Sequence, residues 1–507
     1  MILKKLLQSN ENDVSRAEKT VALTIASMVN TLLSMLLSMV AVRLLTKTEI
    51  AVNSQTFLAY STFAPFLTLG INSGIYYYLS QNEHRKRAAV NECMMLVSAS
   101  SLLFALFICF GGNNMLATMF KNPGIAQTLY YMVPYTLLVT PASILSYVFI
   151  YENRLRFNAV YSTVQTFATL VVVMLAMLWF HTGQSMVISR VLISCVFALV
   201  TAYLAYSILP TGTGRPKWNT MRQLLTISLP LGISSIMGSM FTDLDKWIIS
   251  AMLTPEIYAV YTQGARELPL ISTITGSINT VLIVDLTKSV QERNYQEAVQ
   301  LFRRVAEKTS MLLMPIMVFC FAAAKPIISF LYTGAYLAAA PIFQIYLLYM
   351  PIRVVYYDPF LIALGKSRFV MWKTAVGLFV NAVFSIIFVY TFHAEGAALA
   401  TILSVYCFNV PLNLYVISKE TGIVWTKLLP FREVFECAVY SIPGALLAVF
   451  AAKILPSGMT SIVVLIVEFL LFCVVTVPVF AWRFRIDVRK IARNTWSRVK
   501  QYLGGRC

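Results

Sequence analysis

The chain has 507 residues, of which 58% are hydrophobic and only 12% are charged, and its mean hydropathy is +0.72. Soluble globular proteins carry roughly 25% charged residues, so this composition excludes a soluble domain and indicates a polytopic membrane protein. The net charge of +18 would suggest nucleic-acid binding if it were clustered. The basic residues instead gather in alternate loops, which is the positive-inside pattern of membrane proteins. We therefore predict no nucleic-acid partner.

Apolar runs near the ~20 residues that span a bilayer follow one another along the chain. The first run follows a long polar segment, so it is interpreted as an anchor rather than a cleaved signal peptide. Basic loops such as "RKR" at 85–87 alternate with loops that hold few basic residues, which places both termini in the cytoplasm. We predict fourteen transmembrane helices, at about 21–42, 51–79, 90–110, 128–150, 160–180, 187–208, 224–251, 259–286, 309–332, 341–364, 370–392, 397–417, 434–453 and 460–482.

The chain also shows an internal repeat. A shift of 208 residues places Leu45-Thr46 on Leu253-Thr254 and Gln55 on Gln263 without a gap. We therefore predict an all-α membrane protein in which two parallel six-helix repeats form two lobes around a central cavity. The predicted segments are a cytoplasmic N-terminus at 1–20, repeats at 21–208 and 224–417 joined by a linker at 209–223, two further helices within 434–482, and a basic tail at 483–507 that lies on anionic lipids.

The stretch "GSMFTDLDKWIISAM" at 238–252 places three charged residues inside an apolar run. Charges at mid-membrane cost at least ~2.5–3.5 kcal/mol and usually have a function or a partner. At 100° per residue, the polar residues of this helix share one arc of about 160°. The helix after it carries a second polar stripe that includes Gln263 and Arg266. These patterns predict a water-filled cavity with a cationic site.

We assign the following residues to the predicted site. The substrate-binding set consists of basic and hydrogen-bonding side chains within the predicted spans: Lys246, Arg266, Arg353, Ser239, Thr242, Gln263 and Ser34. The ion-coupling set is Asp243, Asp245, Glu267 and Asp358, with Asp243 and Asp245 flanking Lys246.

Two structural explanations of these residues stay open. Small polar residues allow close packing of membrane helices. Asp243 and Lys246 are spaced i,i+3 and could simply neutralise each other. The cysteines show no CxxC spacing and "LGKSR" at 364–368 lacks the first glycine of a phosphate-binding loop, so we predict neither a metal site nor a nucleotide cofactor.

Several segments resemble the bacterial polysaccharide-export proteins of the O-antigen (Wzx-type) flippase family, within the multidrug/oligosaccharidyl-lipid/polysaccharide exporter superfamily. They include "SLPLGISSIMGSMFTDLDKWIISAML", "YAVYTQGARELPLI", "GAYLAAAPIFQIYLL" and "FLIALGKSRF", and the resemblance covers roughly residues 15–420. It implies a two-lobed helical bundle in the bacterial inner membrane. It also implies a transporter for lipopolysaccharide or capsule biosynthesis that moves an undecaprenyl-pyrophosphate-linked oligosaccharide from the cytoplasmic to the outer leaflet.

The expected partners are the lipid-linked oligosaccharide, H⁺ or Na⁺ as a coupling ion, anionic lipids and other polysaccharide-assembly proteins. A cation-coupled multidrug extruder on the same scaffold is the main alternative. A membrane glycosyltransferase or polymerase that uses "DLD" as a metal-binding motif is less favoured, because Asp243 and Asp245 point about 160° apart on a helix.

Overall fold

The computed structural model describes residues 16–210, 215–266, 268–454 and 460–484. Within these ranges the regular elements are all helices, and eleven of them are long and apolar enough to cross a membrane. The prediction of an all-α polytopic membrane protein is confirmed. The predicted basic tail at 483–507 and most of the N-terminal segment at 1–20 lie outside the described residues.

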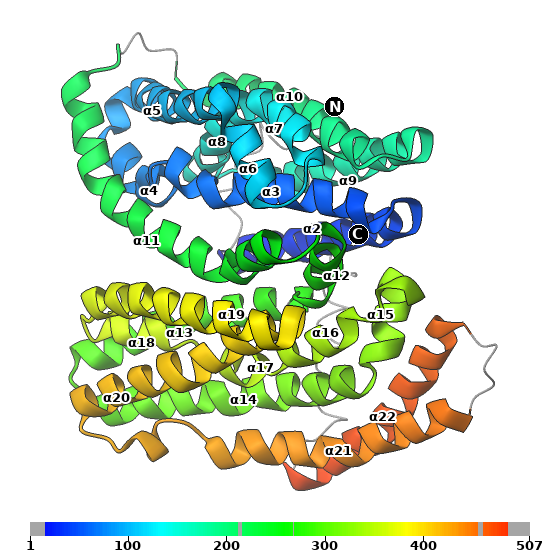
Figure 1. Ribbon diagram of the computed structural model, residues 1–507. Helices are drawn as coiled ribbons and strands as arrows, with labels where there is room; N and C mark the ends of the chain where they lie inside the picture. The colour runs from blue at the N-terminus through cyan, green and yellow to red at the C-terminus, as the bar shows by residue number, and fades with distance from the viewer. Residues whose placement is uncertain (1–15, 211–214, 267, 455–459, 485–507) are drawn as a thin grey trace, which may run out of the picture. The chain divides into compact units, whose positions relative to one another are not determined.

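The chain divides into two compact units, each built from two stretches of sequence. The helices of both units are labelled in Figure 1. Unit 1 comprises residues 1–277 and 365–413, and unit 2 comprises residues 278–364 and 414–507. The helices of unit 1 are α2 (Arg16–Leu44), α3 (Lys47–Leu67), α4 (Ile71–Gln81), α5 (Lys86–Phe107), α6 (Asn113–Met119), α7 (Gly124–Pro134), α8 (Thr140–Tyr151), α9 (Leu155–Phe180), α10 (Gly183–Ile208), α11 (Trp218–Met252), α12 (Pro255–Gly264) and α19 (Ser367–Ser404).

Unit 2 is organised around a long helix that packs against the two C-terminal helices. Helices α13 (Pro269–Gln291) and α20 (Val410–Thr421) cross the boundary between the units. The remaining helices of unit 2 are α14 (Tyr295–Ala322), α15 (Ala324–Tyr332), α16 (Ala339–Leu347), α17 (Met350–Arg353), α18 (Tyr357–Ala363), α21 (Phe431–Ile454) and α22 (Ser461–Arg483).

Several predicted spans are interrupted in the structure. The segment 51–79 is divided at Gly70, and 259–286 is divided between Gly264 and Pro269. The spans at 370–392 and 397–417 follow each other through a sharp bend at His393, where φ is 52°. Helices α11 and α12, which we assigned to the second repeat, pack against α3 within unit 1. The count of fourteen spans and the division into repeats remain predictions.

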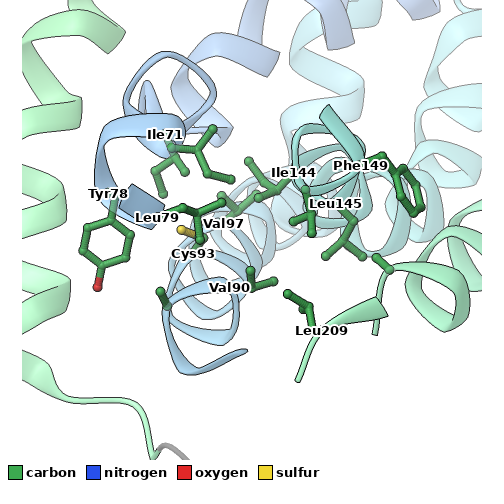
Figure 2. Packing of buried hydrophobic residues seen from close by; sticks show 14 of the residues in the cluster. Ile71, Tyr78, Leu79, Val90, Cys93, Val97, Ile144, Leu145, Phe149 and Leu209 are labelled. Carbon is green, nitrogen blue, oxygen red and sulfur yellow. The ribbon is translucent and has the colours of Figure 1, made fainter. Parts of the chain in front are cut away.

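A core cluster of unit 1 lies between α4, α5, α8 and α9, with the ends of α10 and α11 beside it. Figure 2 shows Ile71, Leu79 and Val97 pointing toward Ile144 and Leu145. All five side chains are buried. This packing of apolar side chains from helices far apart in sequence holds α4 against α5 and α8, and α4 in turn lies beside α11.

Helix α11 approaches the turn before α4 very closely. Gly70 has φ +69°, and a Cβ atom at this position would lie 2.2 Å from the carbonyl oxygen of Ser228. A Cβ atom at Gly232 would in turn lie 2.9 Å from the backbone nitrogen of Gly70. Ser228 and Gly232 belong to the polar arc of α11, so close packing, one of the two structural explanations above, accounts for this part of the arc.

Gly70→Ala should destabilise the protein through both backbone strain and collision with Ser228. The matched control is Gly365→Ala, because Gly365 has φ +74° but no atom lies within 4 Å of the added Cβ. Strain alone costs roughly 1–2 kcal/mol. We expect a measurably lower melting temperature for Gly70→Ala than for Gly365→Ala in purified, detergent-solubilised protein. Equal melting temperatures would show that the close approach does not limit stability.

Candidate functional site

Lys246 and Asp243 form an ion pair on α11. The Lys246 Nζ lies 2.6 Å from Asp243 Oδ1, and the two side chains are 25% and 19% exposed. The i,i+3 spacing brings both groups to the same face of the helix, as the structural explanation predicted. Because both side chains remain partly accessible, the ammonium could still be reached by an anionic ligand.

Asp245 takes a different position from Asp243. Its side chain is buried, its Oδ2 accepts a 2.5 Å hydrogen bond from the Tyr261 hydroxyl, and its Oδ1 accepts from the Lys246 backbone amide at 2.8 Å. Tyr261 lies on α12, so Asp245 joins two helices of unit 1. The Asp245 carboxylate accepts a hydrogen bond from the backbone of Lys246, whereas the Lys246 ammonium is ion-paired with Asp243.

Arg266 lies in an interruption between α12 and α13 rather than on the continuous helix that we predicted. Gly264 ends α12, and Pro269, which lacks a backbone N–H, begins α13. The Arg266 side chain donates from Nε to the Thr262 carbonyl at 3.2 Å and from a terminal nitrogen to the Ser38 hydroxyl at 3.4 Å. The residue is exposed, so its charge faces outward from the packed core of unit 1.

Ser38 links Arg266 to the predicted binding residue Gln263. Its hydroxyl donates to Gln263 Oε1 at 3.2 Å, and it lies on α2. Neither Ser38 nor Tyr261 was among the predicted site residues. The internal repeat indicates Ser38 as a site residue, because a shift of 208 residues places it on Lys246.

The three predicted hydroxyl groups each donate to a carbonyl of their own helix. Ser34 donates to Asn30, Ser239 to Ile236 and Thr242 to Gly238, at distances of 2.9, 3.1 and 3.0 Å. Ser34 and Thr242 are exposed. A hydroxyl oxygen that donates one hydrogen bond can still accept others, so these residues can receive hydrogen bonds from a ligand.

Arg353 and Asp358 belong to unit 2. The predicted span at 341–364 is divided there into α16, α17 and α18, and Arg353 is the last residue of α17. Its guanidinium lies 4.8 Å from the ring centre of Tyr349 and 5.4 Å from that of Tyr356, and it donates to the Tyr356 hydroxyl at 3.2 Å. Asp358 lies in the first turn of α18, while Glu267 is outside the described residues.

The fold is that of membrane flippases and exporters. The chain is similar to the lipid II flippase MurJ in an inward closed conformation, with 13% identity, a TM-score of 0.73, and coverage of 92% of this chain and 99% of that chain. It is also similar to an inward-facing multidrug resistance MATE family transporter of the MOP superfamily, at 12% identity, a TM-score of 0.60, and coverage of 80% and 98%. A MOP superfamily transporter from Pyrococcus furiosus aligns at 13% identity with a TM-score of 0.53, covering 82% and 98%.

Residues 40–341 match the family described as polysaccharide biosynthesis protein. The match covers more than half of the sequence, so the chain belongs to this family. No curated protein matches the chain. The family and the shared fold confirm the resemblance found in the sequence.

Asp243 and Asp245 should respond differently to substitution. Asp245→Ala leaves the buried Tyr261 hydroxyl without its acceptor, which costs about 1–3 kcal/mol. Asp243→Ala removes a partly exposed ion pair, worth about 0–1 kcal/mol. We expect a clearly lower melting temperature for Asp245→Ala and a nearly unchanged one for Asp243→Ala in purified protein. A larger loss for Asp243→Ala would contradict this division of roles.

Proposed function

We propose that the protein is a flippase that moves an undecaprenyl-pyrophosphate-linked oligosaccharide from the cytoplasmic to the outer leaflet by alternating access. The observation that carries the proposal is the pair of accessible cations in unit 1, Lys246 on α11 and Arg266 at the interruption after α12. Hydroxyl and amide side chains such as Ser38 and Gln263 accompany them. Membership of a polysaccharide biosynthesis family supports a glycan substrate.

The chemistry of the head group explains why such a site is needed. A pyrophosphate-linked sugar cannot cross hydrocarbon unaided, because its charges and hydroxyls would lose their hydration. Lys and Arg form charge-assisted hydrogen bonds with phosphate. Interrupted helices mark binding sites in many transporters, and both Arg266 and Arg353 lie at interruptions. We assign Arg353 an assisting role on this ground.

An apolar groove in unit 2 supports a lipid-linked substrate. It lies between α14 and α22, has a volume of about 540 Å³ and is lined almost entirely by apolar groups, which include Met311, Pro315, Phe319, Phe469, Phe472 and Phe480. A prenyl chain would bury apolar surface in this groove while the head group is bound at the proposed cationic site. The groove is therefore the proposed seat of the lipid tail.

Several hydrogen bonds join the first two helices of one predicted repeat to those of the other within unit 1, and three of them lie near the loops between those helices. Thr48 donates to Glu256 at 3.1 Å, Ser38 to Gln263 at 3.2 Å, and Gln55 to Ser250 at 2.7 Å. Thr48 and Glu256 are themselves separated by the repeat interval of 208 residues. Hydrogen bonds from its own backbone amide and from Thr254 hold the pKa of Glu256 below its usual range, so the acceptor is ionised.

We assign these bonds to a gate at the end that the charge pattern places outside the cell. In the proposed cycle they hold this end closed while the head group enters from the cytoplasmic side. They separate when the substrate is released. The proposal includes cytoplasmic termini in the bacterial inner membrane, H⁺ or Na⁺ as the driving ion at Asp243, Asp245, Glu267 or Asp358, and contacts with anionic lipids and other polysaccharide-assembly proteins.

A cation-coupled multidrug extruder is the second candidate, favoured by the shared fold of the MATE family transporter. It would use the carboxylates to bind small cationic drugs. The two candidate functions differ in the sign of the charge on the substrate. The positive charges of Arg266 and of Arg353, which lies against the ring of Tyr349, favour an anionic substrate.

Loss of either cation should weaken binding of the head group without unfolding the protein. A charge-assisted hydrogen bond is worth about 1.5–3 kcal/mol, so Lys246→Ala or Arg266→Ala should weaken binding by about one to two decades. We expect normal membrane abundance, reduced surface glycan and accumulation of the lipid-linked precursor, with partial recovery in Lys246→Arg. Lys453→Ala, at an exposed end of α21, is the control. Normal glycan export by the double alanine variant would overturn the proposed site.

Locking the proposed gate should stop transport. In a Thr48→Cys/Glu256→Cys variant, a short bifunctional thiol reagent should join α3 to α12 and block glycan export. The single Thr48→Cys variant, treated identically, should export normally. A membrane-impermeant thiol reagent should label that variant in intact cells, which tests the outside location. Undiminished export by the cross-linked protein would remove the gate from the mechanism.

A further inference from the structure

A buried carboxylate in unit 2 lies outside the proposed head-group site. Glu468 is the eighth residue of α22 and is 2% exposed. It begins a stripe of buried residues at four-residue spacing that continues through Phe472, Thr476 and Phe480. The sequence around it, "SIVVLIVEFLLFCVV", is otherwise apolar. An acidic residue inside such a helix is a functional candidate by default.

No partner for this carboxylate is found among the described residues. Its Oε2 is among the buried atoms without a partner, and Glu468 takes no part in the ion pairs seen among the described residues of unit 2, such as those that join Arg303 to Glu433 and Arg483 to Glu436. Glu92, the other nearly inaccessible glutamate, has four donors around it by contrast.

Among the described residues, no cation of the elements packed against α22 forms an ion pair with Glu468. On α21, Gly444 and Ala448 lie beside Phe472 and Thr476, and the next turn toward the end of that antiparallel helix carries Ala451 and Ala452. Lys453 of α21 and Lys325 of α15 are exposed rather than directed into the buried surroundings of Glu468 in an ion pair. The charged residues of α14 lie in its first half, at Glu297, Arg303, Arg304, Glu307 and Lys308.

The free-energy cost of an unpaired charge in these apolar surroundings decides whether the Glu468 side chain is protonated. An isolated carboxylate in an apolar environment is so unfavourable that it takes up a proton instead. We infer that Glu468 is a proton-binding site that holds its proton in the packed state described here and exchanges it when α22 moves against α14. Nothing in the head-group proposal uses this residue.

The adjoining groove supplies a reason for that movement. Phe469, Phe472 and Thr476 line the groove between α14 and α22, and Glu468 lies directly beside Phe469 and one turn from Phe472. A chain that enters or leaves the groove must change the packing of α22 on α14. Such a change would alter the access of water to the Glu468 carboxyl, so proton exchange and occupation of the groove would be coupled.

Infrared difference spectroscopy of the full-length protein in lipid nanodiscs tests the site without any substrate. We expect the carbonyl stretch of a protonated carboxyl group that diminishes as pH is raised. The band should be absent in Glu468→Gln and shifted in Glu468→Asp, which keeps a carboxyl group should the Gln variant fail to fold. Glu436→Gln is the control, because Glu436 is ion-paired and should contribute no such band.

A band that keeps its full amplitude across the pH range in which the protein stays folded would overturn the inference, because Glu468 would then be a permanently neutral structural acid. The inference would also be overturned if the protein showed no carbonyl band that disappears in Glu468→Gln. In a glycan-export assay, which does rest on the proposed function, stimulation by an imposed proton gradient should be lost in Glu468→Gln and kept in Glu436→Gln. Because the spectroscopic test needs no substrate, failure of the flippase proposal would leave its result intact.

Discussion

Every charge and backbone polar group that lies within a membrane must find its partner inside the protein, and the path of α11 follows from this requirement. Near its start, the buried Glu92 accepts hydrogen bonds from Tyr78, from Arg85, from the Lys217 amide at 2.8 Å and from Thr220 at 2.9 Å. Near its end, Asp245 is bound by Tyr261. Hydrogen bonds thus attach α11 to other helices of unit 1 near both of its ends. The partly exposed Asp243–Lys246 ion pair lies beside Asp245, near the second of these attachments.

The interrupted helices obey the same requirement in another way. A helix end leaves carbonyl groups without intrahelical partners, and basic side chains stabilise that end. Arg266 donates to the Thr262 carbonyl near the end of α12, and Arg353 is the last residue of α17. A structural and a binding role are compatible for Arg266, because guanidinium has five N–H donors and the side chain is exposed.

Composition and the spacing of apolar runs were sufficient to predict the fold class, and the i,i+3 spacing was sufficient to predict the Asp243–Lys246 pair. The partner of Asp245 could not be predicted, because Tyr261 lies on another helix and only packing brings them together. The break at Arg266 was missed although Gly264 and Pro269 flank it, since the polar stripe continues through the interruption. Glu468 was overlooked because its strongly apolar surroundings resemble a lipid-facing helix.

Glu92 and Glu468 show how burial assigns opposite roles to the same side chain. Glu92 is surrounded by donors that include a guanidinium, so any motion that separates α11 from α5 would leave several buried groups without these partners at once. Glu468 has no such surroundings, so a displacement of α22 would cost little at this residue and would allow its proton to leave. We therefore expect a helix to stay in place where a buried carboxylate accepts several hydrogen bonds. We expect it to move where a buried carboxyl group has no hydrogen-bond partner. On this reasoning, α11 stays fixed at its start during transport, while the α14–α22 contact changes.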